Sequence, residues 1–337
     1  MESTMPRPKS TLVSLDATPY YHCTSRCVRR AFLCGEDLQS GRSFEHRRQW
    51  IEDRMLILAG IYAIDIAAYA VMSNHYHIVL HFDREQGLAW SDAEVIERWH
   101  RLFKGSLLSR RFSRGETLSR AEQRALDELV AEWRERLVSI SWFMRCLNEP
   151  VAREANREDK VTGRFWEGRY TSQALLDEKA LAACMVYVDL NPIRAQMATT
   201  PEASNHTSIQ RRIATARHVQ LPNHQDQQPE QLLPFAGNPR ESMPAGLPFR
   251  LTDYIELVDW SGRILREDKK GVIPEDIPKI LQRLQLDTRH WCYLNRHFEH
   301  PFKHFVGAAH RVRSACETLG RRWVHGISQC ERLFSSG

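Results

Sequence analysis

Two histidines separated by one residue are the sequence feature best suited to chemistry. His75 and His77 lie in the run Asn74–Leu80, whose apolar residues predict a buried strand. Residues i and i+2 of a strand face the same side, so both imidazoles should point to one face and Tyr76 to the other. Two neutral imidazoles side by side form half of a divalent metal site. The plain structural alternative is one core histidine and one surface histidine.

A tyrosine and an asparagine four residues apart form the second feature. Tyr187 and Asn191 lie at the end of a predicted helix that Pro192 closes, so both project from one helical face. A phenol with a pKa of about 10 is a poor nucleophile. A nearby divalent cation favours the phenolate and can also polarise a phosphodiester. Asn191 offers an amide oxygen as a third, hard ligand. Taken singly, the two residues fit a tyrosine at the core edge and a helix-terminal asparagine.

The elements that must position these residues alternate between strands and helices. Their patterns predict strands at 20–26, 65–72, 75–82 and 170–175, helices at 45–59, 92–108, 121–137, 141–157 and 177–190, and a basic loop at 110–120. This order predicts an α+β fold with a ferredoxin-like (RRM-like) antiparallel sheet, helices on one face and a free face for ligand. The apolar stretch 55–72 is about as long as a membrane span. Asp65 and a change of periodicity within it favour a helix that runs into a core strand instead.

Composition divides the chain into regions. We expect a flexible N-terminus at 1–14, a domain carrying both motifs at 15–215, a linker at 216–246, and a mainly helical C-terminal domain at 247–337. The net charge of +5 is a weak hint of an anionic partner.

The remaining histidines and the cysteines suggest no second metal site. The eight cysteines are scattered without a C-x-x-C pair, so they suggest neither a zinc ribbon nor a thioredoxin-like site and fit a reducing cytosol. The polar first nine residues hold no signal-peptide core. His297, His300 and His304 share one helical face, but Pro301 interrupts it, so we interpret them as surface histidines.

A set of motifs in a fixed order resembles a known family. The motifs are Tyr-Tyr-His-Cys-Thr-Ser-Arg at 20–26, Met-Ser-Asn-His-Tyr-His at 72–77, Arg-Phe-Trp-Glu-Gly-Arg-Tyr at 164–170, and Tyr-Val-Asp-Leu-Asn-Pro-Ile-Arg-Ala at 187–195. They resemble the HUH-superfamily single-tyrosine transposases of small insertion sequences, and more closely their REP-associated (RAYT) branch. The resemblance covers 15–215, which would then be the catalytic domain. The region after 247 resembles the extension of larger members.

The resemblance implies a role for each motif residue. His75 and His77 would be the paired metal ligands, with Tyr76 a mild departure from the bulky apolar residue usual between them. Asn191 would complete the site for Mg²⁺ or Mn²⁺. Tyr187 would attack single-stranded DNA, leaving a 5′-phosphotyrosine link and a free 3′-hydroxyl, and rejoining would reverse the step. The implied substrate is a repetitive hairpin element with a short guide sequence.

Basic and aromatic residues near these motifs are candidate DNA contacts, because arginines track phosphates and rings stack on bases. We predict contacts from Arg26, Arg29, Arg30, Lys104, Arg110, Arg111, Arg164, Trp166, Arg169 and Arg194. A solvated basic face, or aromatic packing against the sheet, would explain the same residues without DNA.

The expected partner is single-stranded or hairpin DNA, with no membrane, and the protein would act as a monomer or homodimer. Its expected location is the bacterial cytoplasm, on the nucleoid when bound to DNA. Two other functions stay open. One is a domesticated repetitive-element DNA-binding protein with little or no turnover. The other is a metal-dependent phosphodiesterase that forms no covalent intermediate. A structural role has little support, because the sequence shows no repeat or coiled-coil pattern.

Overall fold

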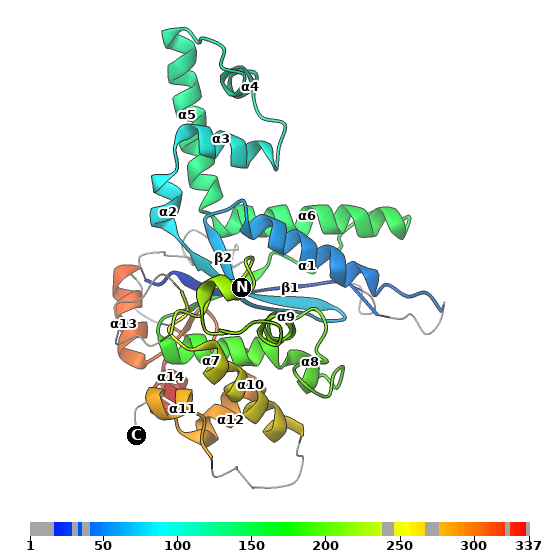
Figure 1. Cartoon of the computed structure of the whole chain (residues 1–337), viewed down its shortest axis with the longest axis vertical. Helices are drawn as coiled ribbons and strands as arrows, with labels where there is room; N and C mark the ends of the chain where they lie inside the picture. The colour runs from blue at the N-terminus through cyan, green and yellow to red at the C-terminus, as the bar shows by residue number, and fades with distance from the viewer. Residues whose placement is uncertain are drawn as a thin grey trace, which may run out of the picture. The chain divides into compact units, whose positions relative to one another are not determined.

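The computed structural model describes residues 17–28, 33–35, 41–237, 246–266, 276–320 and 324–334 (Figure 1). The chain forms two compact units. The first comprises Met1–Gln49, Ile66–His81 and Trp166–Gly337, and the second comprises Trp50–Asp65 and Phe82–Phe165.

A five-stranded sheet carries the sequence motifs. Its strands are β1 (Tyr20–Arg26), β2 (Ile64–Val71), β3 (His75–Phe82), β4 (Thr171–Leu175) and β5 (Phe305–Val306), in the order β2-β3-β1-β4-β5. Strand β1 pairs antiparallel with β3 and β4, while β5 pairs parallel with β4. The order of the first four strands is that of the split β-α-β fold. The predicted α+β, ferredoxin-like class is therefore confirmed.

Helices of the first unit follow β4 along the chain. They are α7 (Glu178–Asp189), α8 (Asn191–Arg194), α9 (Ser208–Ala216), α10 (Leu251–Arg266), α11 (Lys279–Leu284), α12 (Thr288–His297), α13 (Ala309–Thr318) and α14 (Ile327–Phe334), with a 3₁₀ turn η2 (Gln225–Gln227). Asp177 caps α7 by accepting a hydrogen bond of 2.8 Å from the Ala180 amide. All residues of α7 from Ala180 to its end are buried, and the helix packs against β4 and α12. The burial of its apolar side chains thus holds α7, the helix that bears Tyr187, against the sheet.

The second unit is mainly helical, and its only described strand residues are the start of β2 and the last residue of β3. It contains most of α1 (His46–Ala59), then α2 (Arg84–Ala89), α3 (Asp92–His100), α4 (Leu107–Ser113), α5 (Arg120–Leu137) and α6 (Ile140–Glu158). Stacked rings of Trp99 and Trp133, with centroids 5.1 Å apart, join α3 to α5.

The region from 92 to 120 differs from the sequence prediction. One helix was expected at 92–108, but the chain turns between α3 and α4 at Gly105, which has φ +72°. A Cβ there would lie 2.2 Å from the His100 Nε2, so only glycine fits this turn. The predicted loop at 110–120 is wrong in its first residues, because Ser106 caps α4 and the helix continues to Ser113.

The expectation of a free sheet face is not met along β1 and β3. Tyr21 and Cys23, which point to one face, are buried, and so is His22, which points to the other. On β3, Tyr76 and His77 point to opposite faces, and both are buried. The two faces of β1 and β3 are therefore covered at these residues, and the sheet offers no open surface for a ligand there.

The C-terminal region is mainly helical, as predicted, but it also supplies β5 to the sheet. The predicted domain boundaries stay a prediction. The apolar stretch 55–72 is a helix ending at Ala59 and a strand beginning at Ile64. Among the described residues, no helix is both long and apolar enough to span a membrane.

Candidate active site

One face of the sheet gathers polar side chains from three strands. Thr24 of β1 lies opposite His77 of β3, and His22 lies opposite Gln173 of β4. Residues opposite each other share a face, as do residues two apart on one strand. The register therefore places His22 beside His77, although 55 positions separate them in the sequence.

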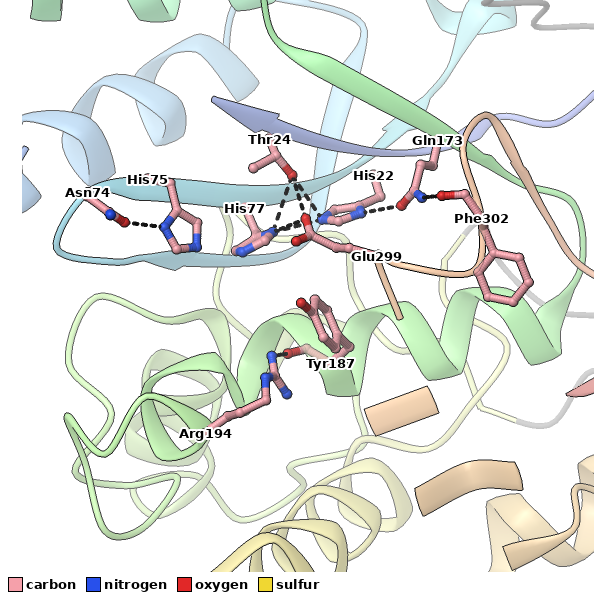
Figure 2. Close-up of polar contacts among 10 residues, drawn as sticks. All are labelled: His22, Thr24, Asn74, His75, His77, Gln173, Tyr187, Arg194, Glu299 and Phe302. Carbon is pink, nitrogen blue, oxygen red and sulfur yellow. Dashed lines mark hydrogen bonds and ion pairs between the residues drawn. The ribbon is translucent and has the colours of Figure 1, made fainter. Parts of the chain in front are cut away.

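The two predicted ligand histidines lie next to each other on β3 (Figure 2). The ring centroids of His75 and His77 are 4.8 Å apart, with the planes at 83°. The His75 Nδ1 lies 2.6 Å from the Asn74 Oδ1. His77 is only 1% exposed, and its Nε2 is buried without a hydrogen-bond partner among the described residues. A buried nitrogen in this state is available to a bound cation or water.

Three other polar atoms surround Nδ1, the opposite ring nitrogen of His77. Its Nδ1 lies 3.0 Å from the His22 Nε2, 3.3 Å from the Thr24 Oγ1 and 3.4 Å from the Glu299 Oε1. The ligand atoms of His22, His77 and Glu299 all lie within 4.8 Å of one another. Imidazole and carboxylate groups grouped in this way can hold a divalent metal.

Sequence analysis missed His22 and Glu299 as site residues. His22 lies two positions before Thr24 on the first predicted strand, but only the pairing register shows that it faces His77. Glu299 reaches the site from the turn after α12, 275 residues from Thr24, with which it makes a hydrogen bond of 3.3 Å. No local pattern in the sequence could have indicated this contact.

Tyr187 projects from α7 toward these histidines (Figure 2). Its ring centroid lies 5.9 Å from that of His77 at 89° and 5.6 Å from that of Phe298. Burial raises the pKa of Tyr187, and the negative charge of Glu299 and a hydrogen bond to it raise it further, while Arg194 opposes them. The phenol is therefore protonated at neutral pH, and it needs a base or a cation to become a nucleophile.

Arg194 holds the tyrosine in place. Its Nη2 donates a 2.8 Å hydrogen bond to the Tyr187 carbonyl, and its Nη1 donates one of 2.6 Å to the Asn295 carbonyl. The guanidinium carbon lies 3.9 Å from the centroid of the Tyr187 ring. These contacts give Arg194 a positioning role, and its predicted contact with DNA stays a prediction.

Asn191, the predicted third metal ligand, is the first residue of α8 and only 6% exposed. Its Nδ2 is buried without a hydrogen-bond partner among the described residues. This amide nitrogen can only donate a hydrogen bond, so a metal would have to be bound by the amide oxygen of Asn191. Its place in a metal site stays a prediction.

The histidines at the site are suited to bind a cation. Burial lowers the pKa of His75 to about 4, and the charge of Arg26 contributes. Burial lowers the pKa of His77 well below its usual value, with His75 and His22 adding to the effect. The pKa of His22 is lowered by burial and partly restored by Glu299. At neutral pH all three rings are uncharged, as metal ligation requires.

The predicted DNA contacts fall in both units. In the first unit, Arg26 and Arg169 are exposed and Trp166 is half-buried. The Trp166 ring contacts Tyr76, with centroids 5.8 Å apart, which matches the alternative of packing against the sheet. Arg29 and Arg30 lie outside the described residues.

In the second unit, Lys104 and Arg164 are exposed. Arg110 bonds the Ser106 carbonyl, while Arg111 forms ion pairs of 3.0 Å and 2.5 Å with two glutamates. All of these contacts with DNA stay predictions.

Comparison with known proteins gives a limited result. No family model matches the chain, and no curated protein matches it. Among solved structures, the chain is similar to a REP-associated tyrosine transposase bound to a REP hairpin. The identity is 11%, the match covers 68% of this chain and 90% of that chain, and the TM-score is 0.36. The functional interpretation therefore rests on the motifs and the geometry of the site.

Proposed function

We propose that this protein is a metal-dependent transposase that nicks and rejoins single-stranded DNA at repetitive hairpin elements through Tyr187. One observation carries the proposal. The phenol of Tyr187 lies against His77, on the face where His75 and His77 stand side by side. A hydroxyl nucleophile beside paired neutral imidazoles suits phosphoryl transfer at a cation.

The residues present fit a divalent cation. We propose that His75, His77 and the amide oxygen of Asn191 hold Mg²⁺ or Mn²⁺, because the His77 Nε2 is buried without a partner among the described residues and the two histidines stand side by side. When bound, such a cation would polarise the phosphodiester. Glu299, whose carboxylate accepts a hydrogen bond from the phenol, can take the phenolic proton.

The proposed reaction balances without an external energy source. The Tyr187 oxygen forms a bond to phosphorus, the bond from phosphorus to the 3′ oxygen breaks, and that oxygen takes up the proton that Glu299 accepted from the phenol. The phosphotyrosine ester conserves the free energy of the broken phosphodiester bond, so attack by a 3′-hydroxyl can reverse the step. Such an enzyme works where DNA is, which in a bacterium is the nucleoid in the cytoplasm.

The test uses labelled single-stranded DNA from repeats that flank the gene, incubated with the protein and Mn²⁺ and separated on a denaturing gel. We expect a labelled protein adduct that resists denaturation. Chelation with EDTA before mixing should abolish it, because the phosphodiester would lose its Lewis acid. The same DNA annealed to its complement is the control. Tight binding to several hairpins without adduct or cleavage would instead establish a DNA-binding protein.

A further inference from the structure

We propose that His22 and Gln173 are positioning residues that hold His77 with its proton on Nδ1, so that the Nε2 lone pair faces the bound cation. This inference rests on the proposed function and concerns the same site. It follows from a chain of hydrogen bonds that begins at a backbone carbonyl and ends at His77 (Figure 2).

The first link fixes the amide of Gln173. Its Nε2 donates a hydrogen bond of 2.8 Å to the Phe302 carbonyl, which can only accept. The Gln173 Oε1 therefore points the other way, to the His22 Nδ1 at 3.0 Å. Because a carbonyl oxygen has no proton to give, the His22 Nδ1 must carry one.

The second link passes this constraint to His77. A neutral imidazole with a proton on Nδ1 keeps a lone pair on Nε2. The His22 Nε2 faces the His77 Nδ1 at 3.0 Å, and the Glu299 Oε1 lies 3.4 Å from the same nitrogen. A lone pair and a carboxylate oxygen both repel another lone pair, so the His77 Nδ1 carries the proton.

The last link is the free nitrogen. With its proton on Nδ1, His77 has a lone pair on Nε2, the buried atom without a partner among the described residues. The His75 Nδ1 is 2.6 Å from the Asn74 Oδ1, an acceptor, so the lone pair of His75 is also on Nε2. The two histidines of β3 thus present equivalent nitrogens to a cation. Outer hydrogen bonds that fix ligand orientation in this way typically change metal affinity by about 10–100-fold.

The same geometry defines the competing arrangement. A cation bound by His22, His77 and Glu299 would need the lone pair of His77 on Nδ1. A neutral imidazole has one lone pair, so the two arrangements exclude each other.

Nitrogen NMR of the metal-free protein tests the tautomer directly. Long-range ¹H–¹⁵N spectra of the imidazoles, with His77 assigned by its absence in His77→Gln, should show a protonated Nδ1 and an unprotonated Nε2. The opposite pattern would overturn the proposal. Since this readout uses the wild-type protein without DNA, it does not depend on cleavage.

Calorimetric titration with Mn²⁺, again without DNA, tests the relay, by which we mean the chain of hydrogen bonds from Gln173 through His22 to His77. Gln173→Leu removes the acceptor for His22 and should weaken Mn²⁺ binding by about 10–100-fold. Gln282→Leu is the matched control, because Gln282 also donates to a backbone carbonyl, that of Ile277 at 2.6 Å, but lies on α11 outside the site.

The outcomes separate the two proposals. Unchanged affinity in Gln173→Leu, or loss of binding in Glu299→Gln while His75→Ala still binds Mn²⁺, would overturn the relay. A confirmed tautomer and the expected loss of affinity, together with no DNA adduct, would leave the relay standing and remove the proposed function.

Discussion

Replacing Tyr187 with phenylalanine should abolish the covalent adduct and reduce strand cleavage by at least about 1,000-fold, the scale seen when an enzyme loses its nucleophile. The change removes only the phenolic oxygen. The ring can keep its contacts with Phe298, at 5.6 Å between centroids, and with the Arg194 guanidinium, at 3.9 Å. We therefore expect the fold and the affinity for hairpin DNA to stay close to those of the wild type.

Single-turnover cleavage on a denaturing gel measures the rate, and fluorescence anisotropy of a labelled hairpin measures binding. Tyr293→Phe is the matched control, because Tyr293 also packs against a histidine ring and lies under an arginine, on α12. It should cleave like the wild type. If Tyr187→Phe keeps most of its cleavage, the reaction does not pass through a phosphotyrosine, and a simple metal-dependent phosphodiesterase explains the site.

Local patterns predicted the part of the site that lies within single elements. His75 and His77 share a face because a strand has a period of two, which holds whatever the strand packs against. Tyr187 was placed on a helix because the apolar run before Pro192 has helical length, and α7 ends at Asp189. These features depend on a few neighbouring residues, so the sequence alone could indicate them.

The rest of the site depends on contacts between distant segments. His22 reaches His77 through strand register, which one sequence does not define. Glu299 and Phe302 come from a region resembling only a helical extension, yet they bond Thr24 and Gln173. The C-terminal region thus contributes to the site and to the sheet, which composition could not show.

A buried network behind Tyr187 should be essential for stability. Asp189 is fully buried, two residues after Tyr187 on α7. Its Oδ1 accepts hydrogen bonds from the Ser208 hydroxyl at 2.5 Å and the Ile209 amide at 3.1 Å. Its Oδ2 accepts one of 2.5 Å from the Tyr254 hydroxyl of α10. One carboxylate therefore joins α7, the helix that carries Tyr187, to α9 and α10.

Asp189 also compensates a buried positive charge. Burial raises its pKa to about 6, and burial lowers the pKa of Arg212 to about 10, so both groups are charged at pH 7. Arg212 donates to the Ala67 and Leu233 carbonyls at 3.0 Å. Its Nε and Nη1 have no hydrogen-bond partner among the described residues. Without the Asp189 charge, this guanidinium would be buried with little compensation.

Asp189→Ala should therefore lower the free energy of unfolding by about 3–5 kcal/mol, because it removes three buried hydrogen bonds and the negative charge that compensates the buried Arg212. Tyr254→Phe removes a single hydrogen bond to the same carboxylate and should cost only about 1–2 kcal/mol. Urea unfolding followed by circular dichroism measures both. Equal losses in the two variants would show that the charge of Asp189 contributes nothing beyond its hydrogen bond to Tyr254. A much larger loss of stability in Asp189→Ala than in Tyr254→Phe would show that the charge of Asp189, two residues after Tyr187, holds α7 in place.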